Sequence, residues 1–492
     1  MNKTHNSSNN FPLLDKDRNI IFALLFFCSM LQTGCSRLIS IDPPNNSLNG
    51  TNVYSIDETA IAAVTNIYST ISKDNHNAFS GSGGLTSISL YAGLSADELT
   101  LFNTSNVFLN NFYANSLTAD YDILLWNYDY GIIFNANSAI EGLTNKNTLT
   151  SEVQNQLLGE AKLIRAFCYF YLVNLYGEVP LVLSTNPIIN STLSKSSVDL
   201  IYSQIIDDLI SAENLLSENF LSGNLIGGTS ERVRPTKWAA AALLARVYLY
   251  NSDFTNSEKQ ASIVIGNQSL FKLDSLDFTF LKNSNESIWQ LQVVDNTSAN
   301  TGDGKVFVLP DSGPNTDNYP VVLSRHIYDN FEIGDLRRKK WIDSVVTDNG
   351  TYFFPYKYKS GALASDNNPT EYIMILRLAE QYLIRAEARI QQGKLQEGVA
   401  DINVIRHRAG LEDIPLTTKD SLNIAVLQER RVELFSEWGH RWLDLKRTKL
   451  IDNVMKDISV EKGGTWNTNW QLYPIANTEL NANSNLTQNE GY

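Results

Sequence analysis

The segment from Glu152 to Tyr176 constrains the fold more than any other part of the sequence. Its second half reads LIRAFCYFYLVNLY, which is apolar on nearly every side of a helix. A helix that is apolar all round has to be buried, either in a protein core or in a membrane. Arg165 and Asn174 interrupt the segment and argue against a membrane span, and Gly177 follows it at a position where helices commonly end. We therefore predict a long, buried helix in a mostly helical fold.

Two stretches share a plan that predicts paired helices. Residues 243–261 and 382–400 each contain a helix with small alanines, a polar turn and a second helix, with a matching arginine and alanine 15 residues apart in both copies. Small residues let two helices approach closely, as in tetratricopeptide hairpins. Generic helical hairpins would give the same pattern, because two copies are too few to establish a repeat. The pattern favours a scaffold of tetratricopeptide-like hairpins.

Two loop-rich regions interrupt this helical pattern. Residues 76–115 contain FSGSGG and then ladders of Ser, Asn, Phe and Tyr, which we interpret as one long irregular segment. Residues 271–358 form an insertion with the short strand-like pieces SIWQLQVV, KVFVLP and TYFFPYKYK. Loops of this length are usually functional or disordered. We expect a mostly α-helical domain over residues 55–492 whose ligand-facing loops are these two regions.

Charge and motif content exclude several functions. The 492 residues carry a formal net charge of −14 and show no clustered basic surface, so we expect no nucleic-acid partner. The five histidines form no zinc motif, and no EF-hand, Walker or GxSxG pattern is present. We therefore expect no cofactor and no metal site. Calcium binding at carboxylates such as Asp303 or Asp311 stays open.

The first 54 residues have the pattern of a lipoprotein signal and tether. The apolar run Ile20–Leu31 follows basic residues and, at 12 residues, suits a signal peptide but is too short to span a bilayer. Small residues then lead to Cys35, whose thiol we expect to take a diacylglycerol, with fatty acids such as palmitate as the anchor. We predict a signal peptide at 1–34 and an acylated N-terminus and polar tether at 35–54. An ordinary signal peptide cut nearby, or a mis-assigned start codon, is the alternative.

Six stretches between residues 159 and 492 resemble a known family. They are GEAKLIRAFCYFYLVNLYGEVPLV, RPTKWAAAALLARVYLY, ILRLAEQYLIRAEA, NVIRHRAGL, ERRVELFSEWGHRWLDLKRT and LYPIANTELNANSNLTQNEGY. In this order, behind a lipoprotein-like signal, they resemble the SusD/RagB family of outer-membrane nutrient-binding lipoproteins of Bacteroidetes. The tail departs from the family at Ala476 and Glu490, where proline is usual, and both are packing or turn positions.

The resemblance implies a binding protein and not an enzyme. Members of the family form a helical scaffold with a loop-rich ligand surface and sit on the cell surface over a SusC-like TonB-dependent transporter. They capture oligosaccharides, or in some cases peptides, and pass them inward. We accordingly expect a lipid-anchored, surface-exposed protein of the outer membrane that binds a glycan and docks on such a transporter. A binder of peptide or another nutrient with the same architecture is the alternative.

Aromatic side chains next to amides or acids in the loop-rich regions are the candidate glycan-binding residues. Sugars present flat C–H faces that pack on aromatic rings, while amides and carboxylates bond their hydroxyl groups. The candidates are Phe102, Asn103, Phe108, Asn111 and Tyr113 in the first region and Phe307, Asp311, Asn315 and Tyr319 in the second. Packing of the loops onto the scaffold is the competing interpretation of each residue.

An acidic pattern near the C-terminus leaves one enzymatic alternative. Glu429, Glu433 and Glu437 recur every four residues and would share one helical face. A pair of carboxylates can perform the acid–base chemistry of glycoside hydrolysis. The adjacent Arg430 and Arg431 favour a salt-bridged or solvated face instead, so we expect no catalytic activity.

Overall fold

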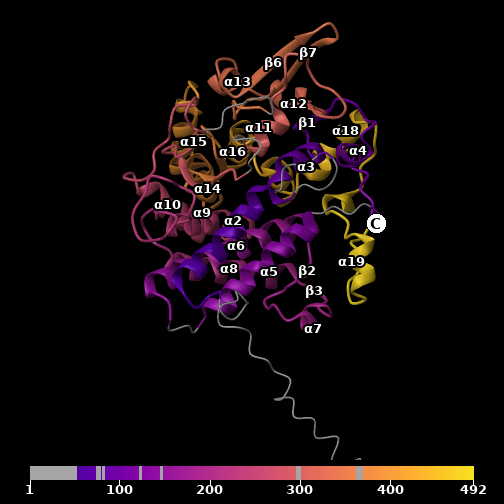
Figure 1. The fold of residues 1–492 in the computed structure, drawn as a ribbon. Coiled ribbons are helices and arrows are strands. Elements are labelled where there is room, and N and C mark those ends of the chain that lie inside the picture. Colours follow the sequence, from indigo (N-terminus) through magenta and orange to yellow (C-terminus); the bar gives the residue numbers. More distant parts are fainter. Residues whose placement is uncertain are drawn as a thin grey trace, which may run out of the picture. The chain divides into compact units, whose positions relative to one another are not determined.

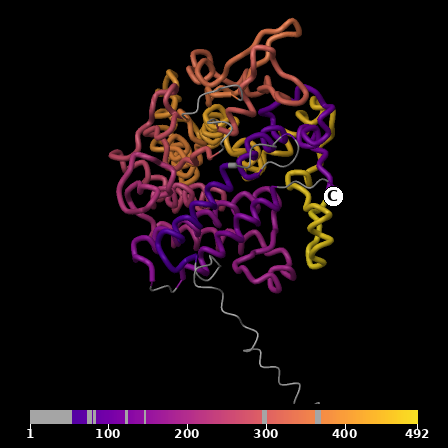
Figure 2. The backbone as a smooth tube through the Cα atoms, viewed as in Figure 1, coloured from indigo at the N-terminus to yellow at the C-terminus, as the bar shows by residue number. Residues whose placement is uncertain are grey.

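The computed structural model of the protein describes residues 53–73, 79, 84–120, 125–144, 148–294, 301–361 and 369–492. The segment Val53–Tyr492 forms one compact unit, whose chain can be followed in Figures 1 and 2. Cys35, the apolar run before it and most of the tether lie outside the described residues. No helix among the described residues combines the length and the apolar character that a membrane span requires.

Three helices at the N-terminal side of the unit pack around the predicted buried helix, α6 (Ser151–Tyr176). They are α2 (Asp57–Lys73), α5 (Leu125–Leu143) and α8 (Val198–Leu215). The prediction for α6 is confirmed, because every residue from Leu163 to Val173 is buried. Arg165 is neutralised inside this core: it forms an ion pair with Asp208 of α8 at 2.7 Å and donates to Asn137 of α5 at 2.8 Å. Gly177 ends α6 with a φ of 75°.

The two predicted helical hairpins are also confirmed. They consist of α9 (Lys237–Tyr250) with α10 (Phe254–Gly266) and of α14 (Leu378–Gln391) with α15 (Leu395–Arg408), and α16 (Lys419–Glu433) follows them. Helix α10 packs against α14, and α14 packs against α16. A buried ion pair of 2.7 Å between Arg246 and Glu380 joins α9 to α14. The hairpins therefore stack into one mostly helical scaffold.

Short antiparallel strand pairs connect the loop-rich regions to this scaffold. The pairs are β1 (Leu99–Leu101) with β5 (Val321–Leu323), β2 (Val179–Pro180) with β3 (Lys195–Ser196), β4 (Ser287–Leu291) with β8 (Ile373–Arg377), and β6 (Ile342–Thr347) with β7 (Gly350–Pro355). Strands β4 and β8 are buried along their whole length, so they tie both ends of the insertion into the core. The β6–β7 hairpin projects at the top of the view in Figure 1.

The loop-rich regions contain more helix than the sequence indicates. Residues 76–115 are not one irregular segment, because they include a 3₁₀ turn (Leu85–Ser87), α3 (Ile88–Ser95) and α4 (Val107–Tyr113). All eight residues of α3 are buried, so tertiary packing defines this helix although its Gly and Ser content suggests a loop. KVFVLP is not a strand either, since it begins within α11 (Gly302–Phe307). The insertion also contains α12 (Arg325–Tyr328) and α13 (Leu336–Lys340).

The helix that carries the acidic pattern ends earlier than predicted. Helix α16 stops at Glu433, and Glu437 lies in the turn before α17 (His440–Arg447). Ser436, Trp438 and Gly439 have positive φ values of 54°, 47° and 68° in this turn. A Cβ atom at Gly439 would come within 2.7 Å of the Ala92 side chain in α3, so the turn fits closely against that helix. The three glutamates therefore do not share one helical face.

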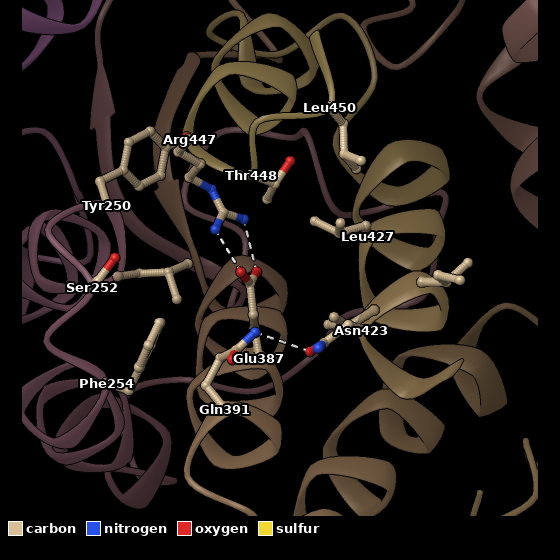
Figure 3. Close-up of a pocket in the computed structure, with 13 residues that line it drawn as sticks. Tyr250, Ser252, Phe254, Glu387, Gln391, Asn423, Leu427, Arg447, Thr448 and Leu450 are labelled. Carbon is tan, nitrogen blue, oxygen red and sulfur yellow. Dashed lines mark hydrogen bonds and ion pairs between the residues drawn. The ribbon is translucent and has the colours of Figure 1, made fainter. Parts of the chain in front are cut away.

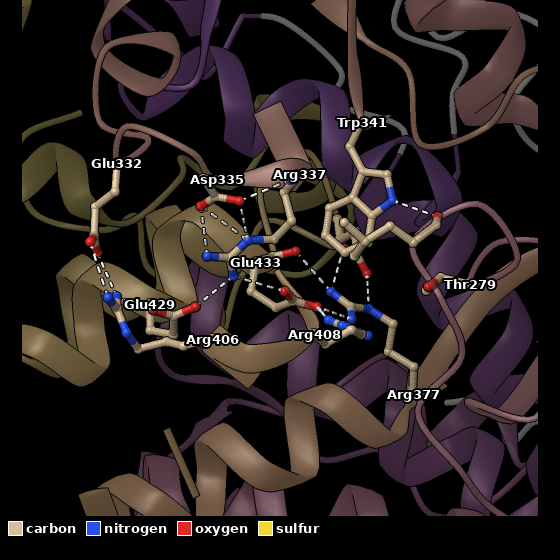
Figure 4. A network of polar contacts seen from close by, with 12 residues as sticks. Thr279, Glu332, Asp335, Arg337, Trp341, Arg377, Arg406, Arg408, Glu429 and Glu433 are labelled. Atoms are coloured by element: carbon tan, nitrogen blue, oxygen red, sulfur yellow. Dashed lines mark hydrogen bonds and ion pairs between the residues drawn. The ribbon is translucent and has the colours of Figure 1, made fainter. Parts of the chain in front are cut away.

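A network of ion pairs nevertheless surrounds these glutamates, and Figure 4 shows the part of it around Glu429 and Glu433. The carboxylate of Glu433 is fully buried and accepts hydrogen bonds from three arginines of different elements. These are Arg337 of α13 at 3.0 Å, Arg377 at the end of β8 at 2.6 Å, and Arg408 at the end of α15. A buried charge is tolerated only when it is paired and hydrogen-bonded. Glu433 therefore holds the insertion, a core strand and a scaffold helix to α16.

The two neighbouring glutamates extend the network on either side. Glu429 accepts a hydrogen bond from Arg337 at 2.6 Å and lies 3.4 Å from Arg406. Glu437 pairs with Arg377 at 2.8 Å. Arg337 bridges Glu429 and Glu433, and Arg377 bridges Glu433 and Glu437, so the network is continuous from the end of α16 into the following turn.

The same part of the chain anchors β1 and β7. Lys357, two residues after β7, donates to the backbone oxygen of Glu433 at 2.8 Å and pairs with Glu437. Asp97, two residues before β1, pairs with Arg431 of α16 and Arg441 of α17, both at 2.7 Å. Burial alone would raise the pKa of Asp97, but the two arginines hold it well below its ordinary value. Asp97 is therefore ionised, and both strands are fixed to one rigid segment.

We expect Glu433→Gln to lower the free energy of unfolding by about 3–5 kcal/mol at neutral pH, because three buried arginines lose their shared charge. Urea denaturation followed by circular dichroism measures this change. Exposed Glu397 on α15 provides the control, since Glu397→Gln removes the same charge without breaking an ion pair among the described residues. Equal stability of the two variants would contradict the role of the network.

The pH dependence of this difference is a second readout of the same variant. Burial alone would raise the pKa of Glu433, but Arg408, Arg377 and Arg337 hold it far below the ordinary value. A carboxyl group with a lowered pKa stabilises the fold above the pKa of the unfolded chain, about 4, and loses this effect as the pH falls further. The stability difference between wild type and Glu433→Gln should therefore shrink below about pH 4.

Candidate functional site

The two loop-rich regions meet at the β1–β5 pair. Leu101 lies opposite Val321 in this pair, and the backbone N–H of Phe102 donates to the carbonyl oxygen of Pro320 at 2.7 Å. Residues more than 200 positions apart in the sequence are therefore neighbours here. Figure 1 places β1, α4 and α12 beneath the β6–β7 hairpin, so one end of the molecule brings together the loops of both regions.

Phe102 is the candidate that presents its ring at this junction. Its side chain is 38% exposed, and its ring meets that of half-buried Tyr352 edge to face, with 5.6 Å between centroids. Asn103 is exposed next to it, and its side-chain oxygen accepts the backbone N–H of Ser105 at 2.8 Å. This hydrogen bond orients the amide and leaves its NH₂ group able to donate. An exposed ring beside an oriented amide is an arrangement that suits a sugar.

Tyr352 is a member of this arrangement that the sequence-based candidates omit. It lies on β7, opposite Val345 of β6, and its contact with Phe102 spans 250 positions of the sequence. The alternation of TYFFP predicts a strand, but it does not predict which distant ring the strand meets.

The remaining candidates in the first region lie on α4. Phe108 packs against the rings of Phe112 and Tyr91 with centroid distances of 5.3 and 5.7 Å.

The other two candidates on α4 are half-buried. Tyr113 packs against the main hydrophobic core, and burial raises the pKa of its hydroxyl. The side-chain nitrogen of Asn111 is buried and has no hydrogen-bond partner among the described residues. Among the described residues, the Phe102 ring makes its aromatic contact with Tyr352 and not with Tyr113. Helix α4 thus supports the junction mainly by packing.

The candidates of the second region mostly pack or shape the loop. Phe307 and Tyr319 are only 3% and 9% exposed, so each ring offers little surface to a ligand. The side-chain oxygen of Asn315 accepts the backbone N–H groups of residues 317 and 318 at 3.1 and 2.8 Å, which closes a tight turn. Asp311 is exposed. The structure thus brings this loop to Phe102 through its backbone, while its rings face the core.

Asp303, one of the carboxylates considered for calcium, is half-buried in α11. Burial and the nearby Glu437 raise its pKa to about 8, and it accepts a long hydrogen bond of 3.4 Å from Ser89. A carboxyl group that is protonated at neutral pH is a poor ligand for calcium. Among the described residues, no three His, Cys, Asp or Glu side chains are grouped as a metal site.

The acidic residues of the enzymatic alternative are occupied by the ion-pair network. Glu429, Glu433 and Glu437 are all buried, and each accepts hydrogen bonds from an arginine. The salt-bridged interpretation of these residues is therefore confirmed, and the solvated interpretation is wrong. The partners are not the adjacent arginines, however, because Arg430 pairs with Asp444 and Arg431 with Asp97. None of the three carboxylates is open to a substrate in this arrangement, which favours a structural role.

A separate cavity of about 320 Å³ lies in the helical scaffold (Figure 3). Its lining comes mainly from α9, α14, α16 and the end of α17. Arg447 and Glu387 form a double hydrogen bond across it at 2.5 and 2.7 Å, and Gln391 donates to Asn423 at 3.0 Å. None of the sequence-based candidates lines this cavity, and its charged groups already satisfy one another.

Two family models match the sequence. The model described as the SusD family matches residues 336–492, and the model described as "Starch-binding associating with outer membrane" matches residues 83–249. The first match includes the network and the β6–β7 hairpin, and the second includes Phe102 and helix α6.

Several curated proteins are similar to the chain. SusD-like protein P2 of Formosa agariphila is 30% identical over 418 residues, which cover 75% of this chain and 80% of that protein. SusD-like protein P25 of the same organism is 24% identical and covers 96% of this chain and 99% of its own length. Starch-binding protein SusD of Bacteroides thetaiotaomicron is 32% identical over 170 residues, which are 32% of this chain and 29% of that protein.

Solved structures share the fold. A SusD superfamily protein from Bacteroides vulgatus has a TM-score of 0.75 at 23% identity and covers 89% of this chain and 100% of its own. A laminarin-binding SusD-like protein has a TM-score of 0.69 at 23% identity, with coverages of 88% and 99%. The family models, the relatives and the common fold agree, and the chain therefore belongs to the SusD family of glycan-binding proteins that associate with the outer membrane.

Proposed function

We propose that this protein captures an oligosaccharide at the outer membrane and delivers it to a SusC-like TonB-dependent transporter. Membership of a glycan-binding family supports the capture role. The observation that carries the proposal for this chain is the exposed ring of Phe102, which stands against Tyr352 where the two loop-rich regions join. Here the exposed ring of Phe102 lies next in sequence to the oriented amide of Asn103.

The chemistry of capture follows from these groups. The C–H face of a sugar ring packs on the exposed face of Phe102, while the amide NH₂ of Asn103 donates to a sugar hydroxyl. Tyr352 holds the Phe102 ring from the side through their edge-to-face contact. Because the contact between Phe102 and Tyr352 is already formed without a ligand, binding requires little ordering of these side chains. Relatives whose names state starch or laminarin make polysaccharides the first ligands to test.

We further propose that the N-terminus anchors the protein to the membrane. Acylation of Cys35 would leave the tether 35–54 between the lipid and α2, so the folded unit could stand over a membrane transporter. A diacylglycerol with an additional acyl chain anchors far more firmly than a single chain.

Phe102→Ala tests the capture site. Protein spanning residues 36–492, which keeps the whole folded unit, is run through affinity gels that contain single polysaccharides, among them starch and laminarin. For the glycan that retards it, we expect calorimetry to show an affinity about tenfold lower in Phe102→Ala, because the stacking contact is lost. The melting temperature should fall by no more than about 2 °C, since the ring is partly exposed and loses a single aromatic contact.

Phe134→Ala is the matched control, because Phe134 on α5 is also exposed, at 49%, but lies outside the loop-rich regions. It should bind like wild type. Unchanged affinity of Phe102→Ala would contradict the proposed surface, and no retardation by any polysaccharide would contradict glycan capture itself.

Cys35→Ser tests the anchor. We expect the variant to move from the membrane fraction to the soluble fraction of the expressing cells, because the thiol that carries the lipid is gone. Cys28→Ser, within the apolar run, removes a thiol at a position that is not acylated and should leave the protein in the membrane fraction. Retention of Cys35→Ser in membranes would show that the lipid is not attached there.

A further inference from the structure

The face of the β6–β7 hairpin opposite Tyr352 carries a stack of aromatic rings and arginines. Phe353 follows Tyr352 on β7, and successive side chains of a strand point to opposite faces. The ring of Phe353 stacks on Tyr328 of α12, with 3.9 Å between centroids and 27° between planes. The guanidinium carbon of Arg338 lies 4.1 Å from the Tyr328 centroid. That of Arg325 lies 5.0 Å from the Phe353 centroid and 5.5 Å from the Tyr328 centroid.

These two arginines differ from all others in the described part of the chain. Every other arginine there donates side-chain hydrogen bonds to a carboxylate or, like Arg232, to backbone carbonyls. Arg325 and Arg338 donate none within the described residues and form no ion pair there. Arg325 is exposed and Arg338 is half-buried. Arg337, adjacent to Arg338 in sequence, is by contrast fully buried in the ion-pair network.

Two guanidinium groups that contact the same tyrosine ring and form no ion pair among the described residues are unexpected in a protein with a net charge of −14. Carboxylates are available close by in sequence, since Asp329 directly follows Tyr328 and is exposed, but it pairs with neither arginine in the described structure. Stacking on a ring occupies the flat face of a guanidinium and leaves the N–H groups at its edge free. Stacking also restricts the side chain, so less conformational entropy is lost when an anion binds.

We infer that Arg325 and Arg338 form a clamp for the carboxylate or sulfate groups of an anionic glycan. The inference rests on the proposed function, that the protein captures a glycan, and adds the charge of that glycan. Guanidinium groups bind planar oxyanions through two parallel hydrogen bonds, which gives both strength and orientation. The rings of Tyr328 and Phe353 hold the clamp in place and are themselves covered, so they do not serve as the sugar platform.

The clamp and the Phe102 surface are close enough to serve one polysaccharide chain. Tyr352 and Phe353 are successive residues, and the hairpin between the two faces is only two strands wide. Neighbouring strands lie about 5 Å apart, so a chain of a few sugars that crosses the hairpin reaches both faces. Phe102 would then pack on one sugar ring, and the arginines would bind a carboxylate or sulfate group of the same polysaccharide.

The test compares anionic and neutral polysaccharides on the protein spanning residues 36–492. The affinity gels contain polygalacturonate for carboxylate, carrageenan for sulfate, and laminarin and starch as neutral probes, with polyglutamate as an acidic peptide. We expect one anionic glycan to retard the protein, with affinity that falls between about 50 and about 500 mM salt. Arg338→Gln and Arg325→Gln should each weaken this binding about tenfold.

Lys339→Gln is the matched control, because Lys339 is exposed, lies next to Arg338 on α13 and carries the same charge. It should change the affinity by less than about twofold, since a screened surface charge contributes little. Arg338→Lys keeps the charge but loses the fork of donors, so we expect an intermediate affinity. Melting temperatures close to that of wild type show that the hairpin is intact.

The outcomes separate this inference from the proposed function. Retention by a neutral glycan alone leaves capture standing and overturns the clamp. Equal binding by the arginine variants and wild type also overturns it, as does equal retention by polyglutamate, which would assign the clamp to acidic peptides. Absence of retention by every glycan would contradict both the clamp and the proposed function.

Discussion

The carboxylate of Glu433 lies fully buried among three arginines, and the position of the loop surface follows from this contact. Each arginine comes from a different part of the fold, namely α13 of the insertion, strand β8 and helix α15. Burying so many charges is costly unless each is paired with good geometry, so alternative placements of the insertion would leave arginines unpaired inside the protein. The network thus selects one arrangement of elements that hydrophobic packing alone would specify less sharply.

The candidate site is held in place by the segment that contains the end of α16, the following turn and α17. Lys357 ties the end of the β6–β7 hairpin to the end of α16, and Asp97 ties the start of β1 to α16 and α17. Phe102 lies five residues after Asp97, and Tyr352 lies five residues before Lys357. Functional loops are often positioned by a rigid scaffold. Here ion pairs to α16 and α17 fix the backbone close to both rings. The ion pairs therefore fix the backbone on both sides of the candidate surface without using the side chains of Phe102 or Tyr352.

Sequence patterns predict those parts of the fold that local periodicity defines. The apolar helix α6 and the alanine-containing hairpins are examples. Burial on all sides requires apolar residues all round a helix, and close helix packing requires small residues, so both are visible in the sequence. Helix α3 leaves no such trace, since it is short and forms only through burial against distant elements. At the candidate site, aromatic and amide composition indicates the two loop-rich regions that meet in the fold, and the candidates include the exposed Phe102. It does not distinguish Phe102 from Phe307 or Tyr319, because which face of a loop turns inward depends on partners far away in sequence.

Hydrogen exchange of the protein with and without its retained glycan tests the central claim most directly, because it reports which backbone segments the ligand protects. The account predicts slower exchange in residues 99–113 and in the β6–β7 hairpin, 342–355, which form the Phe102 surface, and in α12 and α13, which carry the arginines of the clamp. It predicts no change in α9 and α14 around the Glu387–Arg447 cavity. Protection confined to those two helices would place the ligand in the scaffold and contradict the account.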